Sequence, residues 1–168
     1  LKGKVFGIVG FGKIGQAIAQ RAIGFGLDIV YYNRSTKNLD SSIKPFVKPV
    51  SLSELLETSD YISIHLPLTN ETKGFINKHS INKMKKRPII LNISRGAIIN
   101  TNDLVDALKS GQIRGAGLDV TFPEPLSGDH PLCHFDNCVI LPHIGTATRE
   151  CRYNMAQLAA QNIINHFF

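Results

Sequence analysis

Short apolar runs alternate with amphipathic helical stretches along the whole chain. Most of the runs are continuously apolar, as expected of strands in a parallel sheet that is buried on both faces. The runs that predict strands are residues 4–9, 28–32, 61–66, 88–93, 114–120 and 138–142. The stretches that predict helices are residues 13–24, 51–58, 78–86 and 101–110, followed by a last helix over about 146–168. This alternation predicts an α/β fold, with one doubly wound parallel sheet of about six or seven strands in a single domain.

Two of the predicted helices carry start signals. Ser51 and Glu54 have the spacing of a capping box, and so do Asn100 and Asp103. Gly111 stands where the helix over 101–110 would stop. The polar residues therefore support the boundaries that the apolar pattern predicts.

A glycine-rich turn follows the first predicted strand. Gly10, Gly12 and Gly15 in IVGFGKIG complete the pattern G-x-G-x-x-G, and the helix KIGQAIAQRAIGFG follows at once. In this strand–turn–helix context the pattern predicts a dinucleotide site of the Rossmann type. Gly10 permits the tight turn, Gly12 lets the backbone approach the pyrophosphate, and Gly15 lets the helix pack on the sheet. Lys13 and Ile14 join the predicted site at the helix N-terminus, and the alternative is a tight turn without a ligand.

The stretch VYYNRST ends the second predicted strand, where a dinucleotide site usually carries an acid for the ribose hydroxyls. Asn33 stands there instead and removes the repulsion of a 2′-phosphate. Arg34 can bind a phosphate with two charged hydrogen bonds, and Ser35 and Thr36 add hydroxyl donors. The stretch therefore predicts NADPH over NADH. NADH remains the alternative if this is an ordinary basic surface turn.

Charged or titratable groups follow three later strands, at the edge of the sheet where ligands bind in such folds. They are Arg95 in NISRGAIIN, Asp119 and Glu124 in LDVTFPEPL, and His143 in LPHIGTAT. Together they suit the reduction of a 2-keto acid. His143 would donate a proton to the carbonyl oxygen, and a neighbouring Glu124 would favour the imidazolium. Arg95 would bind the substrate carboxylate and polarise the carbonyl.

Each of these groups also has an ordinary structural interpretation when it is taken alone. Arg95 could be a cap or a surface ion pair, Glu124 a loop charge, and His143 a hydrogen-bonded residue at a strand end. His65 follows another strand, and we expect it to be a wall residue beside the cofactor.

Five segments resemble the NAD(P)-binding domain of the D-isomer-specific 2-hydroxyacid dehydrogenases: VGFGKIG, LPLTNETKG, LNISRGAIIN, LDVTFPEPL and NCVILPHIGTAT. The last two resemble particularly the branch that reduces glyoxylate and hydroxypyruvate to glycolate and D-glycerate. The resemblance implies that Arg95, Glu124 and His143 form the catalytic trio. It further implies cofactor contacts at the Gly12–Gly15 turn, in the Arg34 region, and at Pro67, Ile93, Asp119 and Gly145.

The resemblance also implies a second domain, built from the two ends of a longer chain, with the substrate in the cleft between the domains. We expect this sequence to be the NAD(P)-binding domain, residues 1–168, with its final helix leading toward that absent substrate domain. It is expected to bind cofactor, to form a homodimer, and to be inactive alone. The alternatives are an NAD-linked phosphoglycerate, D-lactate or formate dehydrogenase, a corepressor-like protein that senses dinucleotides, and a nucleotide-binding module without chemistry.

The composition is that of an ordinary globular domain, with 168 residues, of which 43% are hydrophobic and 19% charged. No apolar run approaches the roughly 20 residues of a membrane span, so no membrane partner is expected. The net charge of +6 is concentrated in KHSINKMKKRP. That segment has no interleaved aromatic residues, which favours a solvated helix face over a nucleic-acid site.

The three cysteines, Cys133, Cys138 and Cys151, are odd in number and include no C-x-x-C pair. This pattern favours a reducing compartment over a secreted disulfide framework. The cytoplasm is the expected location, and an organelle stays open. Cys133 and Cys138 with His134 and His143 match no common zinc spacing, so no metal site is expected.

Overall fold

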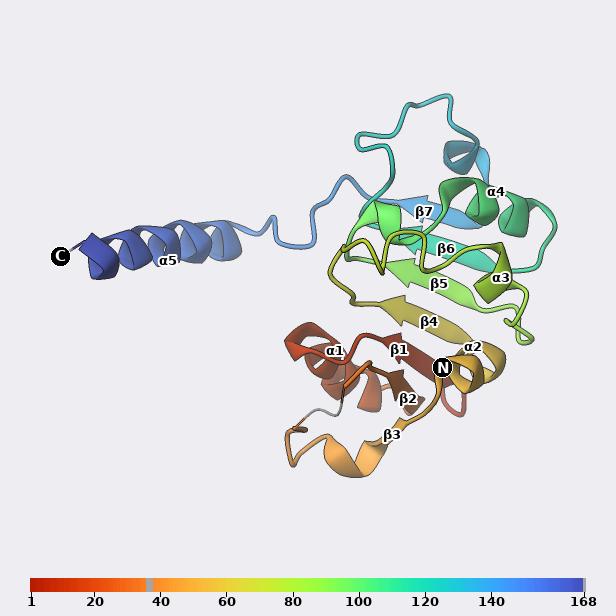
Figure 1. The fold of residues 1–168 in the computed structure, drawn as a ribbon, viewed down its shortest axis with the longest axis horizontal. Coiled ribbons are helices and arrows are strands. Elements are labelled where there is room, and N and C mark those ends of the chain that lie inside the picture. The colour runs from red at the N-terminus through yellow and green to blue at the C-terminus, as the bar shows by residue number, and fades with distance from the viewer. Residues whose placement is uncertain (36–37, 168) are drawn as a thin grey trace.

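Seven parallel strands form one sheet in the part of the chain that the structure, a computed structural model, describes, namely residues 1–35 and 38–167 (Figure 1). The strands are β1 (Val5–Val9), β2 (Asp28–Tyr32), β3 (Val47–Pro49), β4 (Tyr61–Ile64), β5 (Ile89–Asn92), β6 (Gly115–Leu118) and β7 (Cys138–Ile140). Their order is β3-β2-β1-β4-β5-β6-β7. The chain leaves β1 toward β2 and β3 and returns on the other side of β1 as β4. This reversal of strand order is the switch point of doubly wound nucleotide-binding sheets, and it confirms the predicted fold class.

The carboxyl ends of the strands lie in one row across the sheet. Parallel pairing aligns Tyr32, Val9, Ile64, Asn92, Leu118 and Ile140. The first residues beyond this row include Gly10, Asn33, His65, Ile93 and Asp119. The register therefore brings residues from distant parts of the sequence to one edge.

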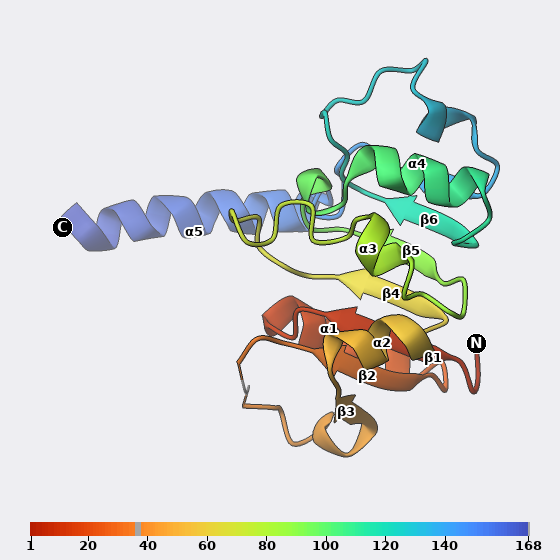
Figure 2. The ribbon, with the colours of Figure 1, turned by 45° about the vertical axis from the view of Figure 1, so that its right-hand side comes forward.

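Helices cover both faces of the sheet. They are α1 (Lys13–Ile23), α2 (Leu52–Thr58), α3 (Lys78–Ile81) and α4 (Thr101–Lys109), with short 3-10 turns η1 (Lys44–Phe46), η2 (Gly96–Ile98) and η3 (Pro131–His134). A fifth helix, α5 (Arg149–Phe167), covers neither face. One apolar core packs α2, α3 and α4 against one face, as Figure 2 shows, and it includes Leu55, Ile81 and Leu104. A second core packs α1 against the other face through Ala19 and Ala22.

The predicted helix starts are confirmed at α2 and α4. The Ser51 hydroxyl accepts a hydrogen bond from the Glu54 N–H (3.1 Å), and the Asn100 side chain accepts one from the Asp103 N–H (3.2 Å). These side chains satisfy N–H groups that have no partner within the helix.

The helix predicted over 78–86 is wrong in its second half, because α3 ends at Ile81. Beyond it the chain turns and buries Met84 in the core. Arg87 then adopts a φ of 50°, a left-handed conformation that an α-helix cannot contain. Burial of Met84 and the approach to β5 therefore override the helical pattern.

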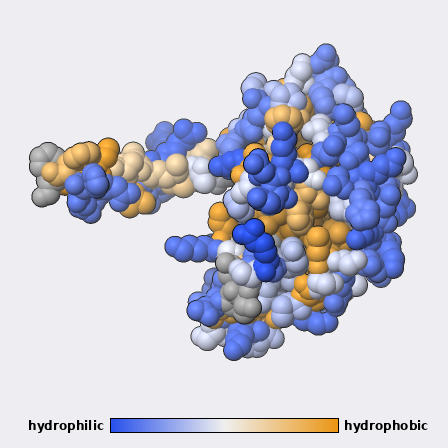
Figure 3. Space-filling view, viewed as in Figure 1, coloured by the Kyte–Doolittle hydropathy of each residue, from blue (hydrophilic) through white to orange (hydrophobic). Residues whose placement is uncertain are grey.

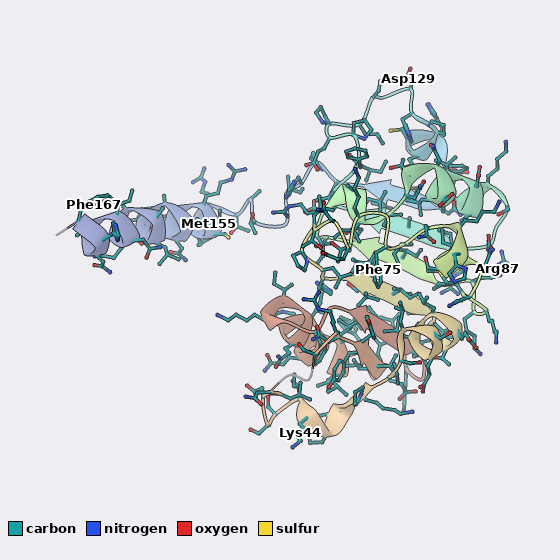
Figure 4. The ribbon with its side chains drawn as sticks, viewed as in Figure 1. Lys44, Phe75, Arg87, Asp129, Met155 and Phe167 are labelled. Carbon is teal, nitrogen blue, oxygen red and sulfur yellow. The ribbon has the colours of Figure 1, made fainter. Side chains whose placement is uncertain are left out.

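The last helix, α5, extends away from the sheet in both ribbon views (Figures 1 and 2). None of its described residues is buried, and apolar side chains lie on its surface (Figure 3). Met155 and Phe167 are 56% and 72% exposed on this projecting element (Figure 4). Across the described residues, no helix has the length and apolar content that crossing a membrane requires.

Candidate active site

The glycine turn joins β1 to α1 through close backbone contacts. Gly10 has a φ of 94°, and a Cβ there would lie 2.6 Å from the carbonyl oxygen of His65. A Cβ on Gly15 would lie 2.4 Å from the carbonyl oxygen of Gly10. Both positions therefore require glycine, one for its conformation and one for the contact between helix and turn.

Gly12 differs from the other two glycines, because a Cβ there would meet no atom within 4 Å. It is the N-cap of α1 and offers no side-chain cap. The first N–H groups of the helix therefore face an open space that suits an anion such as a pyrophosphate.

Asn33 braces the turn from the neighbouring strand. Its side-chain oxygen accepts a hydrogen bond from the Phe11 N–H (3.1 Å), and its amide nitrogen donates to the Ser35 carbonyl (2.7 Å). The Phe11 ring stacks on Tyr31 with centroids 3.9 Å apart. Asn33 stays a predicted cofactor residue, and in this structure its side chain holds the glycine turn.

A cavity of about 340 Å³ lies beside this turn. Its walls come from the turn, from the end of β2 and from the loop after β4. The lining residues are Gly10, Gly12, Tyr32, Asn33, Arg34, Ser35, His65, Leu66, Pro67, Thr69, Glu71, Thr72 and Phe75. Phe75 is labelled at this loop in Figure 4. The glycine cradle, the free helix N–H groups and the Arg34 cation together fit a phosphorylated dinucleotide. Lys13 is exposed and does not line this cavity, and Thr36 lies outside the described residues.

His65 separates this cavity from a second one of about 460 Å³ and lines both. Its Nε2 lies 2.8 Å from the Ser63 hydroxyl, and burial lowers the pKa of His65 to about 4. The imidazole is therefore uncharged at neutral pH, and His65 forms part of the wall of both cavities. The second cavity is also lined by Ile14, Leu66, Pro67, Leu68, Ile93, Ser94 and Arg95.

Glu124 and His143 are brought together across the loops that follow β6 and β7. His143 Nδ1 lies 2.7 Å from Glu124 Oε1, and the two side chains keep 47% and 41% of their exposure. They line a third cavity, of about 450 Å³, together with Asp119. The contact engages Nδ1, and among the described residues no hydrogen bond to His143 Nε2 is found.

Asp119 holds the loop that carries His143. Its carboxylate accepts hydrogen bonds from the N–H groups of Ile144 and Gly145, each at 2.8 Å, and the residue is 7% exposed. His143 itself has a φ of 55°, a conformation that costs a non-glycine residue about 1 kcal/mol. Asp119 and Gly145 were expected at the cofactor, and the structure joins them to each other as a brace for His143.

Arg95 follows β5 and lines the second cavity, whereas Glu124 and His143 line the third. Its Nη1 donates a hydrogen bond to the Ser94 carbonyl (2.7 Å). Arg95, Glu124 and His143 therefore lie at one edge of the sheet but do not line one cavity.

Sequence reasoning missed Asn92, which is buried and shapes the turn after β5. Asn92 donates to the Arg95 carbonyl (3.0 Å) and accepts from the Ser94 N–H (3.1 Å). Its signal is a lone amide in the apolar run PIILNI.

No three His, Cys, Asp or Glu side chains cluster as a metal site would need, within the two described ranges. This edge carries a carboxylate–imidazole pair, a guanidinium and the cavity beside the glycine turn.

Residues 1–145 match the family described as D-isomer specific 2-hydroxyacid dehydrogenase, NAD binding domain. The chain is 49% identical over 164 residues to a glyoxylate reductase of Thermococcus litoralis, covering 98% of this chain and 49% of that protein. It is 46% identical over 158 residues to the glyoxylate reductase/hydroxypyruvate reductase of Homo sapiens, covering 94% of this chain and 48% of that protein.

A solved structure of a glyoxylate reductase from Paecilomyes thermophila is similar, with a TM-score of 0.89 and 40% identity. That match covers 96% of this chain and 48% of the solved chain. The chain spans about half the length of the curated relatives it matches.

Proposed function

This chain belongs to the D-isomer specific 2-hydroxyacid dehydrogenase family, whose NAD-binding domain it carries, and from that premise we propose that it is the cofactor-binding and catalytic part of a reductase. The substrates we propose are glyoxylate and hydroxypyruvate, with NADPH preferred over NADH. A relative named for glyoxylate reduction, at 49% identity, and one named for both reductions, at 46%, support the substrate class. The single observation that carries the chemistry is the hydrogen bond between Glu124 and His143 at the ligand edge of the sheet.

The cofactor would be held by the glycine turn and by the residues around Arg34. The open space over Gly12 and the uncapped start of α1 suit its pyrophosphate. The guanidinium of Arg34 suits a 2′-phosphate. When bound, the cofactor supplies the hydride that reduces the substrate carbonyl.

His143 supplies the proton that the reduced carbonyl oxygen needs. Glu124 holds Nδ1 and so orients the ring with Nε2 toward the ligand. Asp119 keeps the loop in the conformation that presents the ring. Arg95 binds the substrate carboxylate and places the carbonyl, a role that requires it to reach across from its own cavity.

The exposure of the Glu124–His143 pair supports a role for further parts of the protein. Acid–base and hydride chemistry proceed best in a site from which water is excluded, and this pair is nearly half exposed. We propose that α5 leads into a substrate domain that covers the edge, that this chain alone is inactive, and that the protein is a homodimer. A reducing compartment such as the cytoplasm suits its three free cysteines.

The proton-donor role is tested in the full-length protein with hydroxypyruvate and NADPH. His143→Ala should lower kcat/KM by about a hundred- to ten-thousand-fold, as expected for the loss of a positioned acid. Glu124→Gln should lower kcat/KM less, because the ring remains but loses the carboxylate that orients it.

His134→Ala is the matched control, since His134 lies on η3 and is exposed. NADPH affinity should stay within twofold of the parent in all three variants, which distinguishes lost chemistry from lost binding. Reduction that continues in His143→Ala near the parent rate contradicts the assignment.

A further inference from the structure

The cofactor cavity contains one carboxylate and one guanidinium among its described lining residues, and they come from opposite walls. Arg34 follows β2, and Glu71 belongs to the loop after β4. No ion pair within 4.0 Å joins Arg34 to an acid in the ranges that the structure covers. The two charges therefore face the same space without closing it.

Glu71 is held in place by its own loop. The Thr69 hydroxyl donates a hydrogen bond to Glu71 Oε2 (2.6 Å), and the Thr72 hydroxyl donates to the Pro67 carbonyl (2.6 Å). The hydrogen bond from Thr69 lowers the pKa of the Glu71 carboxyl, and the positive charge of Arg34 lowers it further. The carboxylate is thus ionised at neutral pH and fixed by a neighbouring side chain.

The end of β2 lacks the acid that usually accepts hydrogen bonds from the adenosine ribose, because Asn33 stands there and is engaged with Phe11. We propose that Glu71 supplies this carboxylate from the opposite wall and sets the choice between NADH and NADPH against Arg34. The proposal deepens the proposed function and rests on it, since it concerns the same cofactor site.

The two charges have opposite effects on the two cofactors. A carboxylate accepts a hydrogen bond from a free ribose hydroxyl and repels a 2′-phosphate, whereas a guanidinium attracts the phosphate. The preference for one cofactor is the difference between its binding free energy and that of the other. A group that repels the 2′-phosphate therefore reduces the NADPH preference, just as a group that attracts the phosphate increases it. Glu71 therefore keeps the NADPH preference smaller than Arg34 alone would make it.

The test compares dissociation constants of NADPH and NADH in the full-length protein by fluorescence titration. Glu71→Gln keeps the size of the side chain and removes its charge. It should raise the NADPH/NADH affinity ratio roughly two- to fivefold, the size expected for an exposed charge interaction. Arg34→Ala should lower the ratio. Glu57→Gln is the matched control, because Glu57 lies on α2 and pairs with Lys85 (2.6 Å) outside the cavity.

Titration with 2′,5′-ADP and 5′-AMP isolates the contribution of the 2′-phosphate, and the same direction of change is expected there. A ratio that is unchanged in Glu71→Gln overturns the inference, while a parent that still prefers NADPH leaves the proposed function intact. If the parent prefers NADH and Arg34→Ala changes nothing, the proposed NADPH preference fails. In that case weaker NADH binding by Glu71→Gln still supports the role of the carboxylate, and unchanged NADH binding overturns it. Because the readout is a ratio of two affinities in one preparation, a partly misfolded sample does not alter it.

Discussion

The two halves of the sheet's carboxyl edge differ in how firmly the chain itself holds their working groups. In the cofactor half, beyond β1, β2 and β4, Asn33 and two closely packed glycines fix the turn. In the catalytic half, beyond β5, β6 and β7, Glu124 and His143 pair with nearly half of each side chain exposed. Arg95 lines a different cavity from that pair.

We infer from this difference that cofactor binding and catalysis have separate structural requirements. A pyrophosphate is bound by backbone N–H groups and a tight turn, which one sheet and one helix supply. Proton and hydride transfer require converging groups and a site without water. We therefore expect changes at the closely packed glycines of the cofactor half to alter folding and affinity together, and changes in the catalytic half to alter loop geometry while cofactor affinity is kept.

The largest effect is expected at Gly15. Gly15→Ala puts a methyl group 2.4 Å from a backbone oxygen that cannot move without the turn. The free energy of unfolding should fall by about 3 kcal/mol, as for severe overpacking. Thermal and denaturant unfolding measure this loss, and NADPH affinity should fall at least tenfold.

Gly12→Ala is the control for Gly15→Ala, because a methyl group at position 12 meets no described protein atom within 4 Å. Its stability should stay within about 0.5 kcal/mol of the parent, while cofactor affinity falls. Equal stability of both variants would contradict the packing role of Gly15.

His65 lies between the two halves and should make stability depend on pH. Its folded pKa of about 4 is below the ordinary 6.5, so between these values the unfolded chain binds a proton that the folded chain does not. The contribution of neutral His65 to the free energy of unfolding is therefore fully present above pH 6.5. It is lost as the pH falls to 4, and the loss is at most about 3 kcal/mol. Denaturant unfolding from pH 4 to 7 measures the slope. His65→Gln should flatten it, and the same change at exposed His79 should not.

Asp119 offers a test in the catalytic half. Asp119→Asn replaces one of two accepting oxygens with an NH₂ group that faces an N–H donor. The free energy of unfolding should fall by about 2 kcal/mol, the cost of a buried N–H group that loses its hydrogen-bond acceptor. In the full-length protein kcat should fall while NADPH affinity stays near that of the parent. Asp129→Asn, at an exposed carboxylate, is the control. If Asp119→Asn weakened NADPH binding more than turnover, Asp119 would be a cofactor residue, as first expected.

Much of the fold was predictable because it depends on local patterns. Apolar runs located six of the seven described strands, and Ser51 and Asn100 marked helix starts that the structure confirms. The strand β3 (VKP) was missed because Lys48 and Pro49 follow its one buried residue, Val47, so no apolar run marks it. The helix over 78–86 failed because burial of Met84 is a tertiary effect that local propensity does not contain.

The positions of the candidate site residues were more predictable than their contacts. Parallel strands bring their carboxyl ends to one edge, so the positions of Arg95, Glu124 and His143 followed from strand order. The brace between Asp119 and Gly145 did not follow, because it depends on how one loop folds over another strand. The facing of Glu71 and Arg34 across one cavity likewise appears only in three dimensions.

The smallest effect is expected in α5, which directly follows the catalytic half. Leu158 and Ile163 are 63% and 60% exposed, so replacing both with Gln removes no buried contact. Glutamine is also a good helix former. The unfolding free energy of this chain should change by less than about 0.5 kcal/mol. The contrasting variant Leu104→Ala, in the buried face of α4, should lose about 2–5 kcal/mol.

Denaturant unfolding and light scattering on the double variant decide whether α5 stands free in solution. A loss above about 1 kcal/mol would exceed what a surface change produces. Such a loss, or a change in oligomeric state, would mean that α5 buries its apolar side chains against the sheet or a second copy. The catalytic half would then be more complete than its exposed side chains indicate, and the contrast between the two halves would narrow. An unchanged stability of the double variant, beside the expected loss in Leu104→Ala, would mean that α5 makes no stabilising contact within this chain.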